Sequence, residues 1–483
     1  MRFNWSCRTV ALVLSCLSIT AIAGVEGVIP NLKHFSDATG DLATYSTSGN
    51  IDRKSAFFQS LGTNGRTCET CHQTDQAFSL APEKVQQLYD RTHGKDPLFN
   101  AFDGANCPDA DPADRAAHSL LLSHGLIRVA ITVPVHPQFT ISLAHDPYGC
   151  AVRYDPVTNQ QIISVYRRPL PTANLRFLST VMFDGRETGA PLTDANTFST
   201  NLTADLTGQA ISAVLGHAQG AAPPTAAQLA DIVNFEMGLS TAQTHDNNGG
   251  DLEKHGASGG PMALSKQAYY PGSNDSLGHD PHGEAFNPVA FSLYDDWTHS
   301  SDQQKRDIAA GQLVFNTAVA TITDVRGLND NPALGSPASI AGTCTTCHDT
   351  PNVGNHSAPL PLDIGTSRLY AMETNPSIVA GLQHLSAPDM PVFEINGCPD
   401  PQHPGHTLTF YTSDPGKALI TGLCSDINRG KGPVLRGLAA RAPYFHNGAA
   451  ANLDELVDFY DFRFQMNLSS QQKHDLVAFL NSL

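Results

Sequence analysis

The feature that most constrains this chain is a six-residue segment at 67–72 with a near copy at 343–348, which differs at one position. Each copy holds two cysteines three positions apart, with a histidine directly after the second one. This is the attachment motif of c-type haem, because the two thiols add to the haem vinyl groups and the histidine then ligates the iron. A zinc half-site, a structural disulfide and a thioredoxin-type cysteine pair are alternatives, but each leaves the fixed histidine unexplained. The predicted attachment residues are Cys68, Cys71, Cys344 and Cys347, with His72 and His348 as proximal iron ligands.

The start of the chain predicts export. Arg2 and Arg8 flank a short polar start, and residues 9–22 are largely apolar and lead into a small-residue cleavage site, which is typical of a secretory signal peptide. We therefore expect a periplasmic protein with a signal peptide at 1–23. A lipoprotein anchored at Cys16 is the alternative. No later stretch approaches the roughly twenty apolar residues of a membrane span, so we expect none.

Four cysteines lie outside the haem motifs and the signal peptide. An oxidising compartment favours disulfides over free thiols, although buried free thiols are the alternative. Four cysteines allow three pairings, and the local pairing keeps each bridge within one half of the chain. That pairing joins Cys107 to Cys150 and Cys398 to Cys424.

The charge of the chain limits its partners. It carries 29 lysines and arginines against 46 aspartates and glutamates, a formal net charge of −17. A surface of this sign excludes nucleic acid as a natural partner and suits encounter with a basic electron donor in the periplasm. A surface that serves only solubility is the alternative.

The length of 483 residues exceeds what one core holds and predicts two domains or three. We expect a mainly α fold with two cytochrome c-like haem domains, at 24–300 and 301–483. Strand-like alternation at 119–168 predicts a small β insert in the first domain. Residues 245–300 are rich in glycine, histidine and aspartate without a period, so we expect a long loop excursion there. In the second domain, Gly311 is the small residue that would let the first and last helices cross closely.

Two further segments carry a family resemblance. Residues 181–186 and 432–460 are similar to bacterial diheme cytochrome c peroxidases and MauG-type diheme enzymes. In that family an aromatic-Asp-Gly-Arg element lies between the haems, with a tryptophan as the electron bridge and the arginine near a haem propionate. The resemblance implies that Phe183 takes the bridging position and that Arg186 and Arg436 contact the cofactors. Phenylalanine departs from the family, since it carries a radical less readily than tryptophan.

The resemblance also implies a pocket where peroxide reacts. The segment that contains Gln209 is similar to the family's distal segment, in which a Gln-Ala pair is followed by a proton-handling glutamate. The nearest counterpart of that glutamate is His217, eight residues later on the expected helix, and an imidazole can do the same work. A buried structural histidine is the alternative. We expect Glu236 to be a structural carboxylate paired with an arginine, and His93 to be a loop histidine or a switchable ligand.

The distal ligand of the second haem separates the two branches of the family. It lies fourteen residues after the histidine of a Tyr-Phe-His segment, and counting from His446 leads to Tyr460. Peroxidases have methionine there, whereas MauG-type enzymes have tyrosine. A thioether favours ferrous iron, while a phenolate favours ferric and ferryl states. The alternative is a core tyrosine with Met466 as the ligand.

Three functions follow from the resemblance. The first is a MauG-like enzyme that splits hydrogen peroxide at the haem on His72 and stores the oxidising equivalents on both haems as a paired ferryl state. The second is an ordinary peroxidase that draws electrons from a small cytochrome or cupredoxin. The third is a diheme cytochrome that only transfers electrons. The family further implies a protein substrate as one option and a structural calcium ion between the domains.

Overall fold

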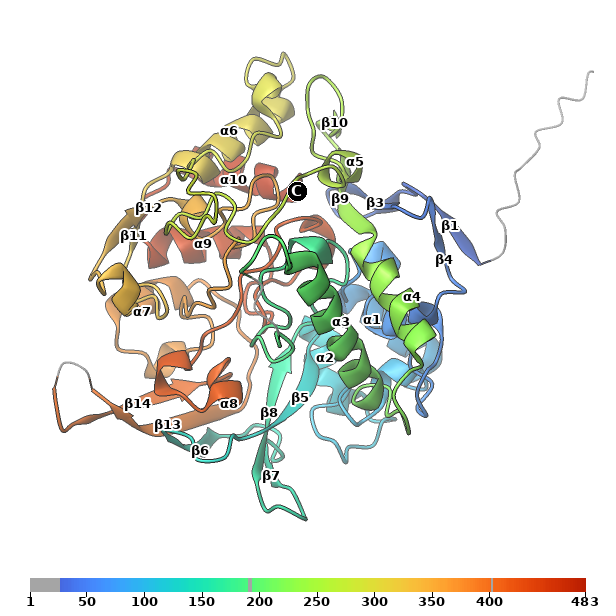
Figure 1. Cartoon of the computed structure of the whole chain (residues 1–483), viewed down its shortest axis with the longest axis vertical. Helices are drawn as coiled ribbons and strands as arrows, with labels where there is room; N and C mark the ends of the chain where they lie inside the picture. The colour runs from blue at the N-terminus through green and yellow to red at the C-terminus, as the bar shows by residue number, and fades with distance from the viewer. Residues whose placement is uncertain (1–26, 190–192, 401–402) are drawn as a thin grey trace, which may run out of the picture.

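The computed structural model of the protein describes residues 27–189, 193–400 and 403–483 (Figure 1). The signal peptide prediction therefore lies outside the described residues. Within them the chain forms ten α-helices and fourteen short β-strands. The helices are α1 (Pro82–Thr92), α2 (Ser119–His124), α3 (Phe198–Leu215), α4 (Ala226–Met237), α5 (Pro261–Leu264), α6 (Gln303–Thr317), α7 (Pro376–Leu382), α8 (Ala418–Thr421), α9 (Leu453–Arg463) and α10 (Ser470–Asn481).

The strands form five small antiparallel sheets, ordered β1-β4, β10-β9-β3-β2, β11-β12, β14-β13-β6 and β5-β8-β7. Their bounds are β1 (Val28–Pro30), β2 (Phe35–Ser36), β3 (Gly40–Ser46), β4 (Asn50–Asp52), β5 (Ile127–Thr132), β6 (Thr140–His145), β7 (Val152–Tyr154), β8 (Gln161–Arg167), β9 (Leu239–Asp246), β10 (Gly250–Asp251), β11 (Ala320–Ile322), β12 (Ile340–Gly342), β13 (Val392–Pro399) and β14 (Thr407–Thr412). The fold is therefore mixed, and the expectation of a mainly α fold is wrong. Two of the pairings, β3 with β9 and β6 with β13, join strands far apart in the sequence, which local patterns do not reveal.

Residues 119–168, where the sequence predicts a β insert, do form strands, but these strands do not pair only among themselves. β5, β7 and β8 pair with one another, as a local insert should. β6 instead pairs with β13 of the second half, with Ile141 opposite Ile395. The insert therefore ties the two halves of the chain together (Figure 1).

The excursion predicted at 245–300 is partly core. It contains β10 and α5 and is otherwise irregular. Its last part, however, buries Phe291, Tyr294 and Trp297 against α6 and α10. The segment is largely irregular, as predicted, but composition did not reveal that its aromatic side chains join the core, where their burial is strongly favourable.

Both predicted disulfides are confirmed. Cys107 is bonded to Cys150 and Cys398 to Cys424. The first bridge fastens the loop after α1 to the strands around β7, and the second fastens β13 to the segment after α8. In the part of the chain that the structure describes, no helix has both the length and the apolar character that a bilayer crossing demands.

Helices α6 and α10 cross closely at Gly311, as the sequence predicts. A Cβ atom added at Gly311 would lie 1.9 Å from the carbonyl oxygen of Asp475 and 2.7 Å from the Cβ of Phe479. Backbone cannot move aside as a flexible side chain can, so the two helices approach this closely only because residue 311 has no side chain.

We expect Gly311→Val to lower the free energy of unfolding by about 3 kcal/mol or more, because the new side chain must push α10 away from α6. Leu313→Ala is the matched control, since Leu313 lies on the same helix and is 60% exposed. It should change stability by less than about 0.5 kcal/mol. Thermal and urea unfolding of both variants would measure this. Equal stability of the two variants would contradict the close crossing.

Candidate functional site

Each of the two cysteine motifs lines its own cavity. Cys68, Cys71 and His72 line one, which we call the first cavity. Cys344, Cys347 and His348 line the other, which we call the second cavity. The cavity walls are mostly apolar, as a haem requires of its pocket.

The two motifs fold into the same turn. Each forms a short 3₁₀ turn, Cys68–Thr70 and Cys344–Thr346, with a reciprocal threonine cap at its start. In both copies the backbone N–H of the histidine donates to the carbonyl oxygen of the first cysteine at 3.0 Å. This shared geometry places both thiols and the imidazole of each motif on one cavity.

Both histidines have the geometry that a haem ligand needs. The Nδ1 atom of His72 lies 3.2 Å from the carbonyl oxygen of Phe78, and that of His348 lies 2.6 Å from the carbonyl oxygen of Gly354. A carbonyl can only accept, so Nδ1 carries the proton and Nε2 is left as the ligand atom. Burial lowers the pKa of His72 to about 4 and also lowers that of His348, so both imidazoles are neutral.

The cysteines do not behave as a redox pair. Burial raises the pKa of Cys71, Cys344 and Cys347 to about 12, and it raises that of Cys68 as well. A thioredoxin-type pair needs a thiol whose pKa is lowered. None of the four forms a disulfide. This chemistry fits thioether attachment of haem and disfavours the thioredoxin-type alternative.

The two cavities share a wall. Phe183 and His446 line both cavities, and their rings stack with centroids 4.3 Å apart and planes 13° apart. Phe183 thus lies between the cavities, where the resemblance places the family's bridging residue. His446 was not foreseen as its partner. Trp297 is buried elsewhere, with its indole N–H donating to the carbonyl of Lys254.

A buried ion-pair network holds Phe183 in place. Arg167 donates to Asp184 at 2.5 Å and to Asp414 at 2.6 Å, and its guanidinium lies 5.0 Å from the Phe183 ring centroid. Burial opposes these charges, but the ion pairs dominate: they raise the pKa of Arg167 and lower the pKa of both carboxyls. Arg186, which lines the first cavity, also donates to Asp184 at 2.9 Å.

Two predicted residues, Gln209 and His217, come together in the first cavity. Gln209 lies on α3, but α3 ends at Leu215, so His217 follows the helix instead of lying on it. The Nδ1 atom of His217 lies 2.5 Å from an oxygen of Asp103. Burial raises the pKa of Asp103, but His217 and Arg66 more than offset this and lower it. Neither Asp103 nor Arg66 was foreseen, because both are distant from His217 in the sequence.

Glu236 does not form the ion pair with an arginine that the sequence analysis predicts. It lines the first cavity, has no arginine among its described contacts, and its Oε2 atom lacks a hydrogen-bond partner. Burial raises the pKa of Glu236 to about 8. The expectation of an arginine pair is wrong, and the side chain is a second group in this cavity that could hold a proton. His93 is exposed at the end of α1 and lines neither cavity.

Tyr460 lies on α9 and lines the second cavity together with His348 and Met466. Its ring packs against Phe445 and Phe464, with centroids 6.2 and 5.9 Å away. Burial raises the pKa of the Tyr460 phenol, so a cation must be close before the phenolate forms. The geometry brings both candidate ligands, Tyr460 and Met466, to the same cavity.

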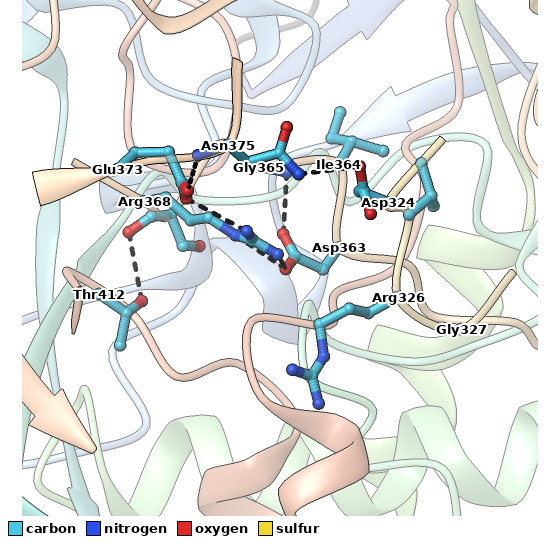
Figure 2. Close-up of polar contacts among 12 residues, drawn as sticks. Asp324, Arg326, Gly327, Asp363, Ile364, Gly365, Arg368, Glu373, Asn375 and Thr412 are labelled. Atoms are coloured by element: carbon cyan, nitrogen blue, oxygen red, sulfur yellow. Dashed lines mark hydrogen bonds and ion pairs between the residues drawn. The ribbon is translucent and has the colours of Figure 1, made fainter. Parts of the chain in front are cut away.

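A loop that contributes to the lining of the second cavity is held by ion pairs. Figure 2 shows Arg368 between two carboxylates, and its guanidinium donates to Asp363 at 2.7 Å and to Glu373 at 3.1 Å. Ile364 and Thr366, which line the second cavity, lie between these paired residues. The ion pairs of Arg368 with Asp363 and Glu373 therefore hold this part of the cavity wall in place.

Three cations at the shared wall were not foreseen: Arg168 and Arg441, which are buried, and Lys431, which is partly buried. Arg168 and Lys431 line both cavities, and Arg441 lines the second. Burial lowers the pKa of Lys431 to about 8, of Arg168 to about 9 and of Arg441 to about 10. Among the described residues, no carboxylate forms an ion pair with any of the three. Haem carboxylates fit such a wall, because unpaired buried cations are costly.

The same wall does not fit a calcium ion, which needs six to eight oxygen ligands and would be repelled by three cations. Arg436 also differs from its expected place, because it lines neither cavity. Its guanidinium donates to the carbonyl oxygens of Gly259, Asn352 and Leu483, so it fastens the C-terminus.

Comparisons with known proteins find partial relatives, while no family model matches. The cytochrome-c peroxidase IdrP1 of Pseudomonas sp. (strain SCT) is 35% identical over 81 residues, which is 14% of this chain and 21% of that protein. The cytochrome-c peroxidase IdrP1 of Denitromonas iodatirespirans is 30% identical over 210 residues, 39% of this chain and 51% of that protein. The matches thus span from a fifth to a half of these relatives. They support a relation to haem peroxidases without deciding the branch.

Among solved structures, a MauG-like protein associated with microbial copper homeostasis is similar with a TM-score of 0.28 and 15% identity. The similarity covers 69% of this chain and 79% of that one.

We expect Cys344→Ala together with Cys347→Ala to leave one covalent haem per chain instead of two, because the second cavity loses both attachment points. Cys68→Ala with Cys71→Ala is the matched pair and should remove the other haem. A pyridine haemochrome assay against protein concentration would count them. Two haems surviving either double substitution would contradict the assignment.

Proposed function

We propose that the chain is a periplasmic diheme c-type enzyme that reacts with hydrogen peroxide in the first cavity and shares the oxidising equivalents with the haem of the second. The observation that carries this proposal is the asymmetry of two cavities with one common wall. The first holds groups that can exchange protons, namely His217 and Glu236. The second holds a candidate sixth ligand, Tyr460. A cytochrome that only transfers electrons needs no such difference.

The chain's own groups suit proton transfer in the first cavity. Because Asp103 holds Nδ1 of His217, the Nε2 atom is left to take a proton from one peroxide oxygen and return it to the other. The amide of Gln209 can donate a hydrogen bond to the bound oxygen. When bound, the haem supplies the iron centre at which the O–O bond is broken.

The shared wall suits exchange of oxidising equivalents. The stacked rings of Phe183 and His446 shorten the path between the cavities. Arg186 and the three wall cations would neutralise the haem carboxylates on both sides. Phenylalanine does not hold a stable radical, so we place the oxidising equivalents on the cofactors and not on this ring.

Tyr460 favours the MauG-like branch, since a phenolate ligand stabilises oxidised iron. Met466 lines the same cavity and supports the second candidate, an ordinary peroxidase that accepts electrons from a small basic cytochrome or cupredoxin. The formal net charge of −17 suits such a donor. Met182 lines the first cavity, and its thioether could occupy the iron position that peroxide needs. If cyanide binds the resting enzyme, that position is open and Met182 is not a ligand.

The periplasmic placement rests on the signal peptide that the sequence predicts at 1–23, and the two disulfides, which persist in oxidising compartments, are consistent with it.

We expect His217→Ala to slow peroxide turnover by about 10²- to 10⁴-fold, the usual loss when an acid or base is removed, while both haems stay attached. His93→Ala is the control, because His93 is exposed outside both cavities, and it should leave turnover unchanged. Stopped-flow mixing with peroxide measures both. A loss below about threefold in His217→Ala would remove His217 from the proposal, and Glu236→Gln would then test the remaining group.

We expect Tyr460→Met to raise the reduction potential of the haem on His348, because a thioether replaces an anionic phenolate. The haem on His72 should be nearly unaffected. Met466→Leu is the matched control and should shift neither potential. Spectroelectrochemical titration separates the two haems. If Met466→Leu shifts the potential and Tyr460→Met does not, Met466 is the ligand and the ordinary peroxidase replaces the MauG-like proposal.

A further inference from the structure

We propose that the protein binds one divalent transition-metal ion, with zinc as the best fit, at a buried site made of Asp275, Asp349 and His356 and separate from the two haems. These three residues, the Asp–Asp–His cluster, are 1%, 0% and 5% exposed. One ligand atom from each lies within 4.8 Å of the others. The inference does not depend on the peroxidase proposal.

Both carboxylates are held by backbone and keep one oxygen free. One oxygen of Asp349 accepts from the backbone N–H of Ser357 at 2.7 Å. One oxygen of Asp275 accepts from the backbone N–H groups of Leu277 and His279, at 3.0 and 2.7 Å, and lies 2.8 Å from Nδ1 of His279. The other oxygen of each carboxylate has no hydrogen-bond partner. Carboxylates fixed in this way are typical of metal ligands supported by a second layer of hydrogen bonds.

The imidazole of His356 lies between the two free oxygens. Its Nδ1 is 3.1 Å from Asp349 Oδ2 and its Nε2 is 3.7 Å from Asp275 Oδ1. Neither ring nitrogen makes a hydrogen bond, although the side chain is 95% buried. Buried polar atoms in native proteins almost always make a hydrogen bond, whereas these four only approach one another as ion pairs. Four ligand atoms that face one another in this way point to a bound cation.

Charge favours a divalent ion over a proton. A proton on His356 would offset Asp349, and His279 lies against Asp275, so protons balance both carboxylates only if both imidazoles are charged at once. A divalent cation balances both carboxylates and leaves the imidazole neutral, the form that ligates metals.

The donor set selects the kind of metal. Two carboxylate oxygens with one imidazole nitrogen suit zinc and its neighbours among first-row divalent ions. Calcium and magnesium prefer oxygen ligands alone, so this site is not the calcium site that the family resemblance implies. The buried hydroxyls of Thr350 and Ser357, next to the ligands in sequence, also lack partners.

The position suggests what the ion does. Asp275 comes from the excursion at 245–300, while Asp349 and His356 follow the second cysteine motif. The backbone of His356 in turn accepts from the hydroxyl of Ser179 in the first half of the chain. His356 also lines the second cavity. An ion there would cross-link the excursion to the haem-binding segment beside His348.

A second acidic cluster, formed by Asp307, His474 and Asp475, lacks these features. The imidazole of His474 is 61% exposed. Asp307 and Asp475 each accept a hydrogen bond from a glutamine side chain, at 2.5 and 2.8 Å. We do not propose a metal site at this second cluster, and we use it as the control.

The test is the metal content of the full-length holoprotein. After loading with zinc and removal of free ions, plasma mass spectrometry should find about one zinc per chain in addition to the haem iron. Asp275→Asn and His356→Gln should each lower the zinc content more than tenfold while keeping both haems, and His474→Ala should leave it unchanged. Dialysis against a chelator should lower the melting temperature of the wild type, and zinc should restore it.

Several outcomes would overturn the site. They are a wild type that retains no zinc or other first-row divalent ion besides iron, a zinc content unchanged in Asp275→Asn, and calcium bound where zinc is not. If Asp275→Asn fails to fold, the chelator and zinc cycle on the wild type decides the question. If the melting temperature responds neither to the chelator nor to zinc, the metal proposal is refuted. A protonated His356 would then supply the positive charge of the cluster.

Discussion

The rest of the site depends on the buried ion pairs of Arg167 with Asp184 and Asp414. Arg167 ends a strand of the first half, Asp184 follows Phe183, and Asp414 follows β14 in the second half. Removing one partner of such a buried pair costs about 3–5 kcal/mol, because the other charge is left unpaired. The network therefore fixes Phe183 against His446 and at the same time docks the two halves of the chain.

Features encoded locally could be predicted from the sequence. The cysteine motifs need only six consecutive residues, so their turns follow from sequence alone, and Gly311 marks the helix crossing because only glycine fits there. The disulfides were predictable because the four remaining cysteines lie in two pairs. What these predictions share is that one short segment contains the whole physical reason.

Features that depend on distant segments could not be predicted. The Asp103 carboxylate that holds His217 is 114 positions away, and β6 pairs with a strand some 250 positions later. Arg168, Lys431 and Arg441 look like ordinary surface cations in the sequence, since nothing local indicates that folding buries them together. Glu236 was misjudged for the same reason, because its missing partner is a property of the whole cavity.

The shared wall links folding to cofactor binding. A chain with a formal net charge of −17 nevertheless places three cations in its interior, without a carboxylate among the described residues to pair with them. Burying them is costly in the bare polypeptide and becomes favourable when anionic haem groups lie beside them. Because the folded state would then bind haem more tightly than the unfolded state does, the proposed haems would stabilise the fold by mass action. The wall that sets the path between the cavities is thus also the part of the fold that most needs the haems in place.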